Sequence, residues 1–172
     1  MVLGAVQTGF KYAIIRGYDI AFQYDADCQH DPSFINLLIE PIIKNEADVV
    51  IGSRYIENFG YCTPIFRRMG MVTFSLLSSL TLRIKITDTT SGFRALNKIA
   101  LSFFARYYPV DFPDAEAIVL LGRNGFRIKE IPVQFHPRSS GSSSISFLKS
   151  VYYPFKSFIA IFAAILEKRR RE

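Results

Sequence analysis

The chain has 172 residues, of which 49% are apolar and 21% are charged. This length and composition predict one globular domain with its own core and exclude a disordered chain. The formal net charge of +6 suits an anionic partner: phosphorylated lipid, nucleotide, nucleic acid or a membrane surface. The two cysteines, Cys28 and Cys62, form no zinc or disulfide pattern, which favours a reducing compartment.

The first elements in the chain are a helix and a short apolar strand. Apolar residues recur at helical spacing through 4–16, and Gly17 is a natural helix stop. Residues 18–24, with apolar side chains at 20–22, predict a buried strand that ends at Asp25. After it, Asp31 and Pro32 predict an N-cap followed by a proline in the first helical turn.

The helix that begins there is predicted to run toward residue 44, with a break at Pro41. Residues 48–52 then predict a second short buried strand. Strand, helix and strand in this order indicate a parallel sheet with right-handed crossovers. Asp25 and Arg54 each follow the carboxyl end of a strand, where ligands bind in open α/β sheets.

The second half predicts helices at 63–82, 97–107 and 113–125, a strand or extended loop at 89–96, and a strand at 127–135. Pro132 in the last strand indicates a sheet edge. Residues 138–146 are a polar loop. No uninterrupted run of about 18 apolar residues, the length of a transmembrane helix, is present.

The last segment, 147–172, is apolar and ends in four consecutive basic residues. This pattern predicts a helix lying on an anionic membrane surface. The alternative is a helix packed on the domain or on another subunit.

The strongest indication of a functional site is the pair of carboxylates at Asp25 and Asp27, directly after the first strand. Carboxylates two residues apart can turn toward one point, and they are hard oxygen ligands suited to Mg²⁺ or Mn²⁺. An ion held there can stabilise a diphosphate leaving group. The alternative is that these acids cap the following helix, a role expected of Asp31.

Four segments together carry a resemblance to a known family. They are Asp25-Ala26-Asp27 with Gln29-His30 behind it, 47–55 (ADVVIGSRY), 87–95 (TDTTSGFRA) and 131–144. In order and spacing they resemble family 2 glycosyltransferases, most closely the dolichyl-phosphate mannose synthase branch, and they cover nearly the whole chain. The resemblance implies an α/β GT-A fold, Rossmann-like, with a mostly parallel sheet flanked by helices.

The resemblance also implies roles for individual residues. Donor diphosphate would be bound by Asp25, Asp27 and Gln29, with Asp25 and Asp27 holding Mg²⁺ or Mn²⁺. The acceptor phosphate would be bound by Arg54, Arg67, Arg68 and Arg138, since an arginine fork can contact phosphate at two points. Each arginine has the alternative of a solvated surface charge.

A general base is harder to assign. Asp114 or Glu116 is the candidate, because the family places an acidic residue there in the acceptor site. Both also lie at a helix start, where acids stabilise the helix dipole. Asp88 is expected to order the turn that follows it, and His30 either contacts a phosphate or neighbours the helix cap.

Two features depart from the family pattern. Cys28 stands beside the acidic pair, where relatives usually carry glycine or an apolar residue. The family's first strands, which bind base and ribose, have no counterpart before residue 4. We therefore expect residues 1–146 to form a partial, N-terminally truncated domain, followed by the membrane-surface segment 147–172.

The resemblance implies a metal-dependent, inverting transfer of a sugar from an NDP-sugar to a polyprenyl phosphate. The alternatives are a cell-surface glycan acceptor, or a non-catalytic fragment that acts as a binding or assembly partner. A peripheral position on the cytoplasmic face of a membrane is expected, with no nucleic-acid partner. A companion chain or oligomer could cover the exposed sheet edge and supply the base and ribose contacts.

Overall fold

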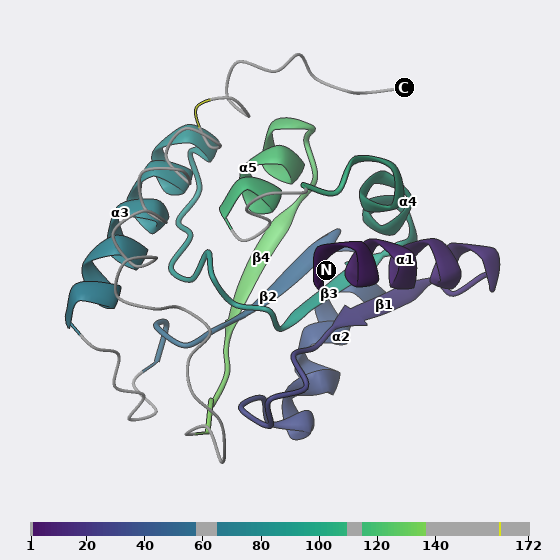
Figure 1. Ribbon diagram of the computed structural model, residues 1–172, viewed down its shortest axis with the longest axis horizontal. Helices are drawn as coiled ribbons and strands as arrows, with labels where there is room; N and C mark the ends of the chain where they lie inside the picture. The colour runs from purple at the N-terminus through teal and green to yellow at the C-terminus, as the bar shows by residue number, and fades with distance from the viewer. Residues whose placement is uncertain (1, 58–64, 110–114, 137–161, 163–172) are drawn as a thin grey trace.

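The computed structural model describes residues 2–57, 65–109, 115–136 and 162, without the side chains of 2, 3 and 65–67. In these ranges a four-stranded sheet is flanked by helices on both faces (Figure 1). The helices are α1 (Val2–Ile15), α2 (Ile35–Ile43), α3 (Ile65–Leu82), α4 (Lys98–Tyr107) and α5 (Ala115–Arg123). The strands are β1 (Ile20–Gln23), β2 (Val49–Ser53), β3 (Arg94–Asn97) and β4 (Ile128–Pro132), and a 3₁₀ turn, η1 (Pro32–Phe34), precedes α2.

The strand order is β1-β3-β2-β4. β3 pairs antiparallel with both β1 and β2, while β2 pairs parallel with β4. β1, β2 and β4 therefore run in one direction, as predicted, and this mixed α/β sheet agrees with the expected GT-A class. The prediction did not place β3 between β1 and β2. That insertion brings the chain entering β3 to the edge where β1 and β2 end.

The core has two layers, because side chains of a strand alternate between the two faces of the sheet. Val49 and Ile51 of β2 pack with α1, α4 and α5, whereas Val50 packs with Leu38 of α2 on the opposite face. All five residues of β2 are buried, as predicted for a central strand. β1 is only half-buried, contrary to the prediction, because it is an edge strand in the described sheet.

The predicted helix ends are largely confirmed. Asp31 accepts a hydrogen bond from Ser33 N at 2.9 Å and caps η1. Gly17 ends α1 with a φ of 76°, a conformation that costs glycine little. The predicted break at Pro41 was wrong: α2 continues to Ile43, with Pro41 buried in its last turn. The helix loses one backbone donor there, and burial of the proline ring offsets that loss.

Candidate functional site

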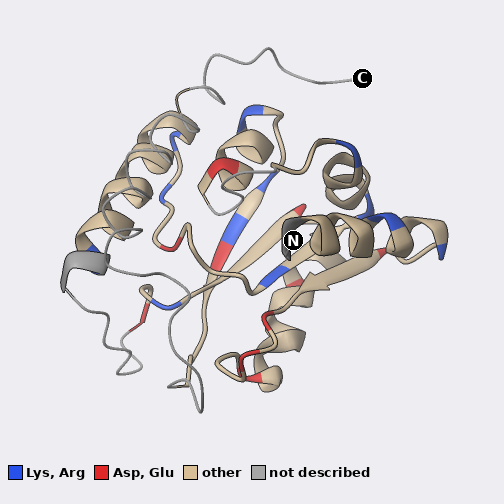
Figure 2. Ribbon diagram, in the orientation of Figure 1, with Lys and Arg blue, Asp and Glu red and all other residues tan. Residues whose placement is uncertain are grey.

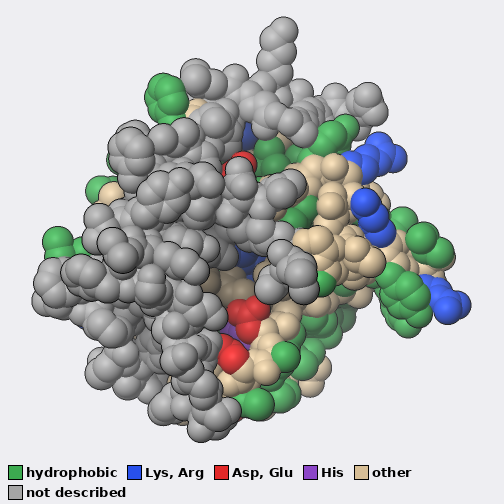
Figure 3. Space-filling model, viewed as in Figure 1, with side chains coloured by type: hydrophobic (Ala, Val, Ile, Leu, Met, Phe, Trp, Pro, Cys, Tyr) green, Lys and Arg blue, Asp and Glu red, His purple; other side chains and the backbone are tan. Residues whose placement is uncertain are grey.

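Three segments meet at one edge of the sheet. The loop 24–31 leaves the carboxyl end of β1, Arg54 leaves that of β2, and residues 87–93 lead into β3. Because β3 runs antiparallel to its neighbours, its start lies beside their ends. Acidic residues gather along the loop between β1 and α2 (Figure 2). Acidic side chains and a histidine lie together on the face shown in Figure 3.

Asp25 and Asp27 are both present in the loop, and both reach its surface. The Asp25 side chain is 57% exposed, and its Oδ2 lies 3.6 Å from Nε2 of His30. Asp27 is half-buried, and its Oδ1 accepts a hydrogen bond from Gln29 N at 3.2 Å. Between them and Gln29, Cys28 has a φ of 59° and an exposed thiol. Cys28 thus adopts the left-handed conformation that is uncommon outside glycine, and both acids lie in the loop that follows β1.

The surroundings of Asp25 lower the pKa of its carboxyl group. The largest cause is the interaction with the His30 side chain; partial burial acts in the opposite direction. The charges of His30, Arg94 and Arg54 lower the pKa further. Asp25 is therefore ionised at neutral pH, as a ligand for a cation must be.

Gln29 fastens this loop to the segment that follows β4. Its Nε2 donates to His136 O at 3.3 Å, and its own carbonyl accepts from His136 N at 2.8 Å. The next residue, His30, forms an isolated antiparallel bridge with Phe135. Gln29 thus lies beside the acidic pair, as expected. His30 is 4% exposed and packed among aromatic rings, so direct contact with a phosphate, one of the two roles considered for it, does not fit its position.

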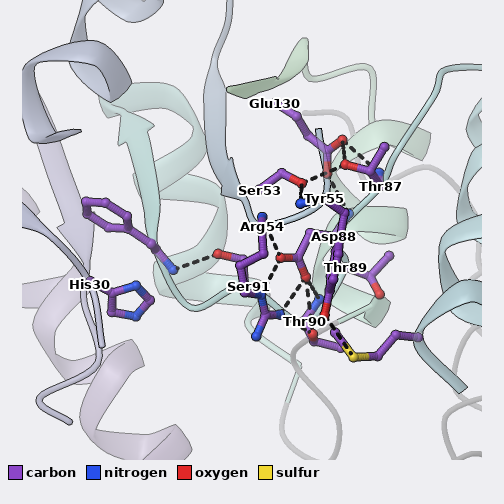
Figure 4. A network of polar contacts seen from close by, with 12 residues as sticks. His30, Ser53, Arg54, Tyr55, Thr87, Asp88, Thr89, Thr90, Ser91 and Glu130 are labelled. Atoms are coloured by element: carbon purple, nitrogen blue, oxygen red, sulfur yellow. Dashed lines mark hydrogen bonds and ion pairs between the residues drawn. The ribbon is translucent and has the colours of Figure 1, made fainter. Parts of the chain in front are cut away.

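Arg54 is held by Asp88 in a two-point ion pair (Figure 4). Its Nε lies 2.7 Å from Oδ2 and its Nη2 lies 2.7 Å from Oδ1, and Nη2 also donates to Thr90 Oγ1 at 2.7 Å. The Asp88 side chain is fully buried and that of Arg54 is 11% exposed. Asp88 also accepts from Thr90 N at 3.2 Å, so its expected role in ordering the turn is confirmed.

Glu130 of β4 supports this turn from inside the fold (Figure 4). Its carboxylate accepts from Thr87 N at 2.7 Å, from Thr87 Oγ1 at 2.8 Å and from Asp88 N at 2.8 Å. Thr87 Oγ1 in turn lies 2.6 Å from Ser53 Oγ. Burial raises the pKa of Glu130 and outweighs these hydrogen bonds, and the Asp88 charge raises it further.

The other predicted residues are placed less completely. Arg68 is exposed near the start of α3, and Glu116 is half-buried in the first turn of α5. Asp114, Arg138 and the side chain of Arg67 lie outside the described residues, as does 147–172 apart from one residue. The structure therefore brings Asp25, Asp27, Gln29 and Arg54 to one edge of the sheet. The positions of the other predicted residues relative to that edge remain expectations.

The family follows from the comparison with known proteins. The model of the family described as "Glycosyl transferase family 2" matches residues 2–103, more than half of the chain. The chain belongs to glycosyl transferase family 2. Its acidic pair, Arg54 and the turn at Asp88 all lie inside the matched range.

Several curated relatives have names that specify a dolichyl, undecaprenyl or dolichol phosphate. The chain is 33% identical over 134 residues to a UDP-N-acetylglucosamine–dolichyl-phosphate N-acetylglucosaminyltransferase of Methanococcus voltae, covering 76% of this chain and 53% of that protein. It is 32% identical over 152 residues to an undecaprenyl-phosphate mannosyltransferase of Micrococcus luteus, covering 83% and 60%. A dolichol-phosphate mannosyltransferase of Pyrococcus furiosus is 32% identical over 152 residues, covering 81% and 41%. The chain spans about half the length of the curated relatives it matches.

Sequence reasoning missed several residues of the site. Glu130 was visible in principle: alternation along β4 puts it on the same face as Ile128, which packs against the core. A carboxylate at a core-facing position needs hydrogen-bond donors. The aromatic packing of His30 gave no such signal, because it brings together Phe93 and Phe135 from distant parts of the chain. No helix within the described ranges has the length and apolar character required to cross a bilayer.

Proposed function

We propose that this chain carries the donor-diphosphate and metal site of a glycosyltransferase that moves a sugar from an NDP-sugar to a polyprenyl phosphate. The observation that carries the proposal is the acidic pair Asp25 and Asp27, at the carboxyl edge of the sheet, in a family 2 chain. The relatives' names, which specify dolichyl-, undecaprenyl- and dolichol-phosphate transferases, favour the lipid acceptor.

The two acids fit a divalent ion, Mg²⁺ or Mn²⁺. Both are carboxylates at the surface of one loop, and the pKa of Asp25 is already lowered. The described residues contain no group of three or more histidine, cysteine or acidic side chains that could hold a metal. The protein would thus supply two ligands and leave the others to diphosphate oxygens and water. A bound ion would stabilise the charge that develops on the leaving diphosphate.

The acceptor phosphate is the second part of the proposal. Arg54 and Arg68, with Arg67 and Arg138, are the proposed cationic contacts. The guanidinium of Arg54 is oriented by Asp88 and Thr90, so a phosphate would meet a group whose direction is already fixed. Glu116 or Asp114 is the proposed base for an inverting transfer. A phosphate acceptor is already anionic at neutral pH, so it requires little help from a base.

A transfer assay tests the proposed function. The chain, together with the companion chain expected to supply the base and ribose contacts, would be incubated with radiolabelled UDP- and GDP-sugars, a polyprenyl phosphate and Mg²⁺ or Mn²⁺. We expect label in the organic phase, lost when the metal is chelated. A soluble oligosaccharide in place of the lipid is the control for the alternative acceptor. Label only in the oligosaccharide, or in neither acceptor with a folded chain, would contradict the proposal.

A further inference from the structure

The carboxylate of Asp25 lies directly over Gly92. The register of β1 and β3 pairs Ile20 with Asn97 and Gln23 with Arg94. Continued for two more residues, it places Asp25 opposite Gly92. A Cβ added to Gly92 would lie 2.7 Å from Cγ and 2.9 Å from Oδ1 of Asp25, distances at which one of the groups must move.

Backbone conformation does not account for a glycine at this position. The positive-φ glycines among the described residues are Gly17 and Gly125, and Gly92 is not one of them. Alanine can therefore adopt the backbone conformation of Gly92 without the strain of the left-handed region. What alanine would disturb is the space occupied by the Asp25 carboxylate.

The other side of the carboxylate is bounded by His30. Its Nε2 lies 3.6 Å from Asp25 Oδ2. Its ring centre lies 5.0 Å from that of Phe93, 4.5 Å from that of Phe135 and 5.2 Å from that of Tyr24. Tyr24 also donates its hydroxyl to His30 O at 2.8 Å. The ring is thus fixed by packing on three sides, and turning it away from Asp25 would disrupt those contacts.

The polar atoms of His30 point to the same role. Its Nδ1 is buried and has no hydrogen-bond partner among the described residues, so Asp25 is the polar group that its side chain contacts there. A buried imidazole with one unsatisfied nitrogen is costly. Stability alone would favour an apolar ring among these aromatic side chains.

We propose that Gly92 and His30 form a socket that sets the direction of the Asp25 carboxylate and thereby the affinity of the acidic pair for a divalent ion. This inference rests on the proposed function. Both are positioning residues, because they act through Asp25. Residues that orient a metal ligand typically change metal affinity 10- to 100-fold when substituted, so we expect an effect of at least about tenfold.

Mn²⁺ binding to the full chain tests the socket without requiring transfer activity. The probe is Mn²⁺ alone, with the free ion followed by electron paramagnetic resonance. Gly92→Ala intrudes on the carboxylate, and His30→Phe keeps an aromatic ring but removes the nitrogen. Each should weaken Mn²⁺ binding about tenfold or more. Gly9→Ala is the matched control, because a Cβ added there meets nothing within 4 Å.

A double-variant comparison separates positioning from general damage. If the socket acts through Asp25, Gly92→Ala should cost no further Mn²⁺ affinity in a chain that already carries Asp25→Asn. Near-UV circular dichroism checks that each variant is folded, and His30→Phe carries the test if Gly92→Ala fails to fold.

The outcomes distinguish the socket from the metal site itself. Wild-type affinity in both Gly92→Ala and His30→Phe, with loss in Asp25→Asn, would overturn the socket and leave the proposed function standing. Wild-type affinity in Asp25→Asn and Asp27→Asn, or no Mn²⁺ binding by the unchanged chain, would overturn the metal assignment and the socket with it.

Discussion

Replacing Arg54 by alanine should destabilise the fold substantially. The substitution removes three side-chain hydrogen bonds of 2.7 Å and leaves the fully buried Asp88 carboxylate without its cation. Removing one partner of a buried ion pair typically costs about 3–5 kcal/mol. For a chain of this size each kcal/mol lowers Tm by roughly 2–4 °C, so Arg54→Ala should melt about 6–20 °C lower.

Urea unfolding at pH 7, followed by far-UV circular dichroism, measures this loss. Lys98→Ala is the matched control: the Lys98–Asp19 pair spans 3.3 Å, but both side chains are exposed, so its midpoint should not change. Adding Asp88→Asn to Arg54→Ala should recover part of the loss, because no unpaired charge then remains buried. The reasoning is refuted if Arg54→Ala loses less than about 1 kcal/mol, or if the double variant loses the sum of the two single losses.

Three other predictions concern separate parts of the chain. Asp27→Ala should abolish metal-dependent sugar transfer; full activity in that variant with the metal chelated would reject its role. The pKa of Glu130 is raised in the fold, so the stability that its protonation confers is fully present below the unfolded pKa and is lost as pH rises through the folded value. As pH rises above about 4.5, the unfolding free energy of wild type should therefore fall relative to that of Glu130→Gln. A difference between the two that stays constant with pH would count against this assignment. Deleting residues 168–171 should reduce flotation with anionic liposomes, each basic residue contributing about 1 kcal/mol, and equal recovery with neutral liposomes would indicate packing or hydrophobic insertion instead.

The elements that local sequence determines were predicted well. Asp31 and Gly17 act within a few residues of their own positions, so their roles at helix ends are legible in the sequence. A short apolar run predicted the fully buried strand β2. The predicted helix break at Pro41 was wrong because α2 tolerates this proline through the burial of its ring, which local sequence does not show.

The sheet order lay beyond local reasoning. Which strands become neighbours depends on long-range pairing, and β3 inserts between β1 and β2 although it follows both in the chain. The same pairing decides the site. Asp25 and Asp27 were identified from their own loop, but the neighbours of Asp25 come from distant positions. The register of β1 and β3 places Gly92 beside Asp25. Packing on Phe93 and Phe135 holds His30 beside the same carboxylate.

Arg54 illustrates how a residue can be identified without its partner. Its place after β2 indicated an anion-binding role, whereas the structure shows that Asp88 and Thr90 already engage its guanidinium. Asp88 lies 34 residues away in the chain and is itself supported by Glu130, a further 42 residues on. Such a chain of buried polar contacts appears only when three strands and a turn are assembled.

Anomalous diffraction from crystals of the chain grown with Mn²⁺ and a nucleoside diphosphate tests the central claim most directly. The account predicts a single strong manganese peak within coordination distance, about 2.0–2.3 Å, of carboxylate oxygens of both Asp25 and Asp27, with the diphosphate completing the ligand sphere. A diphosphate bound at this edge of the sheet without manganese at the two carboxylates, or manganese bound at other residues, would contradict it.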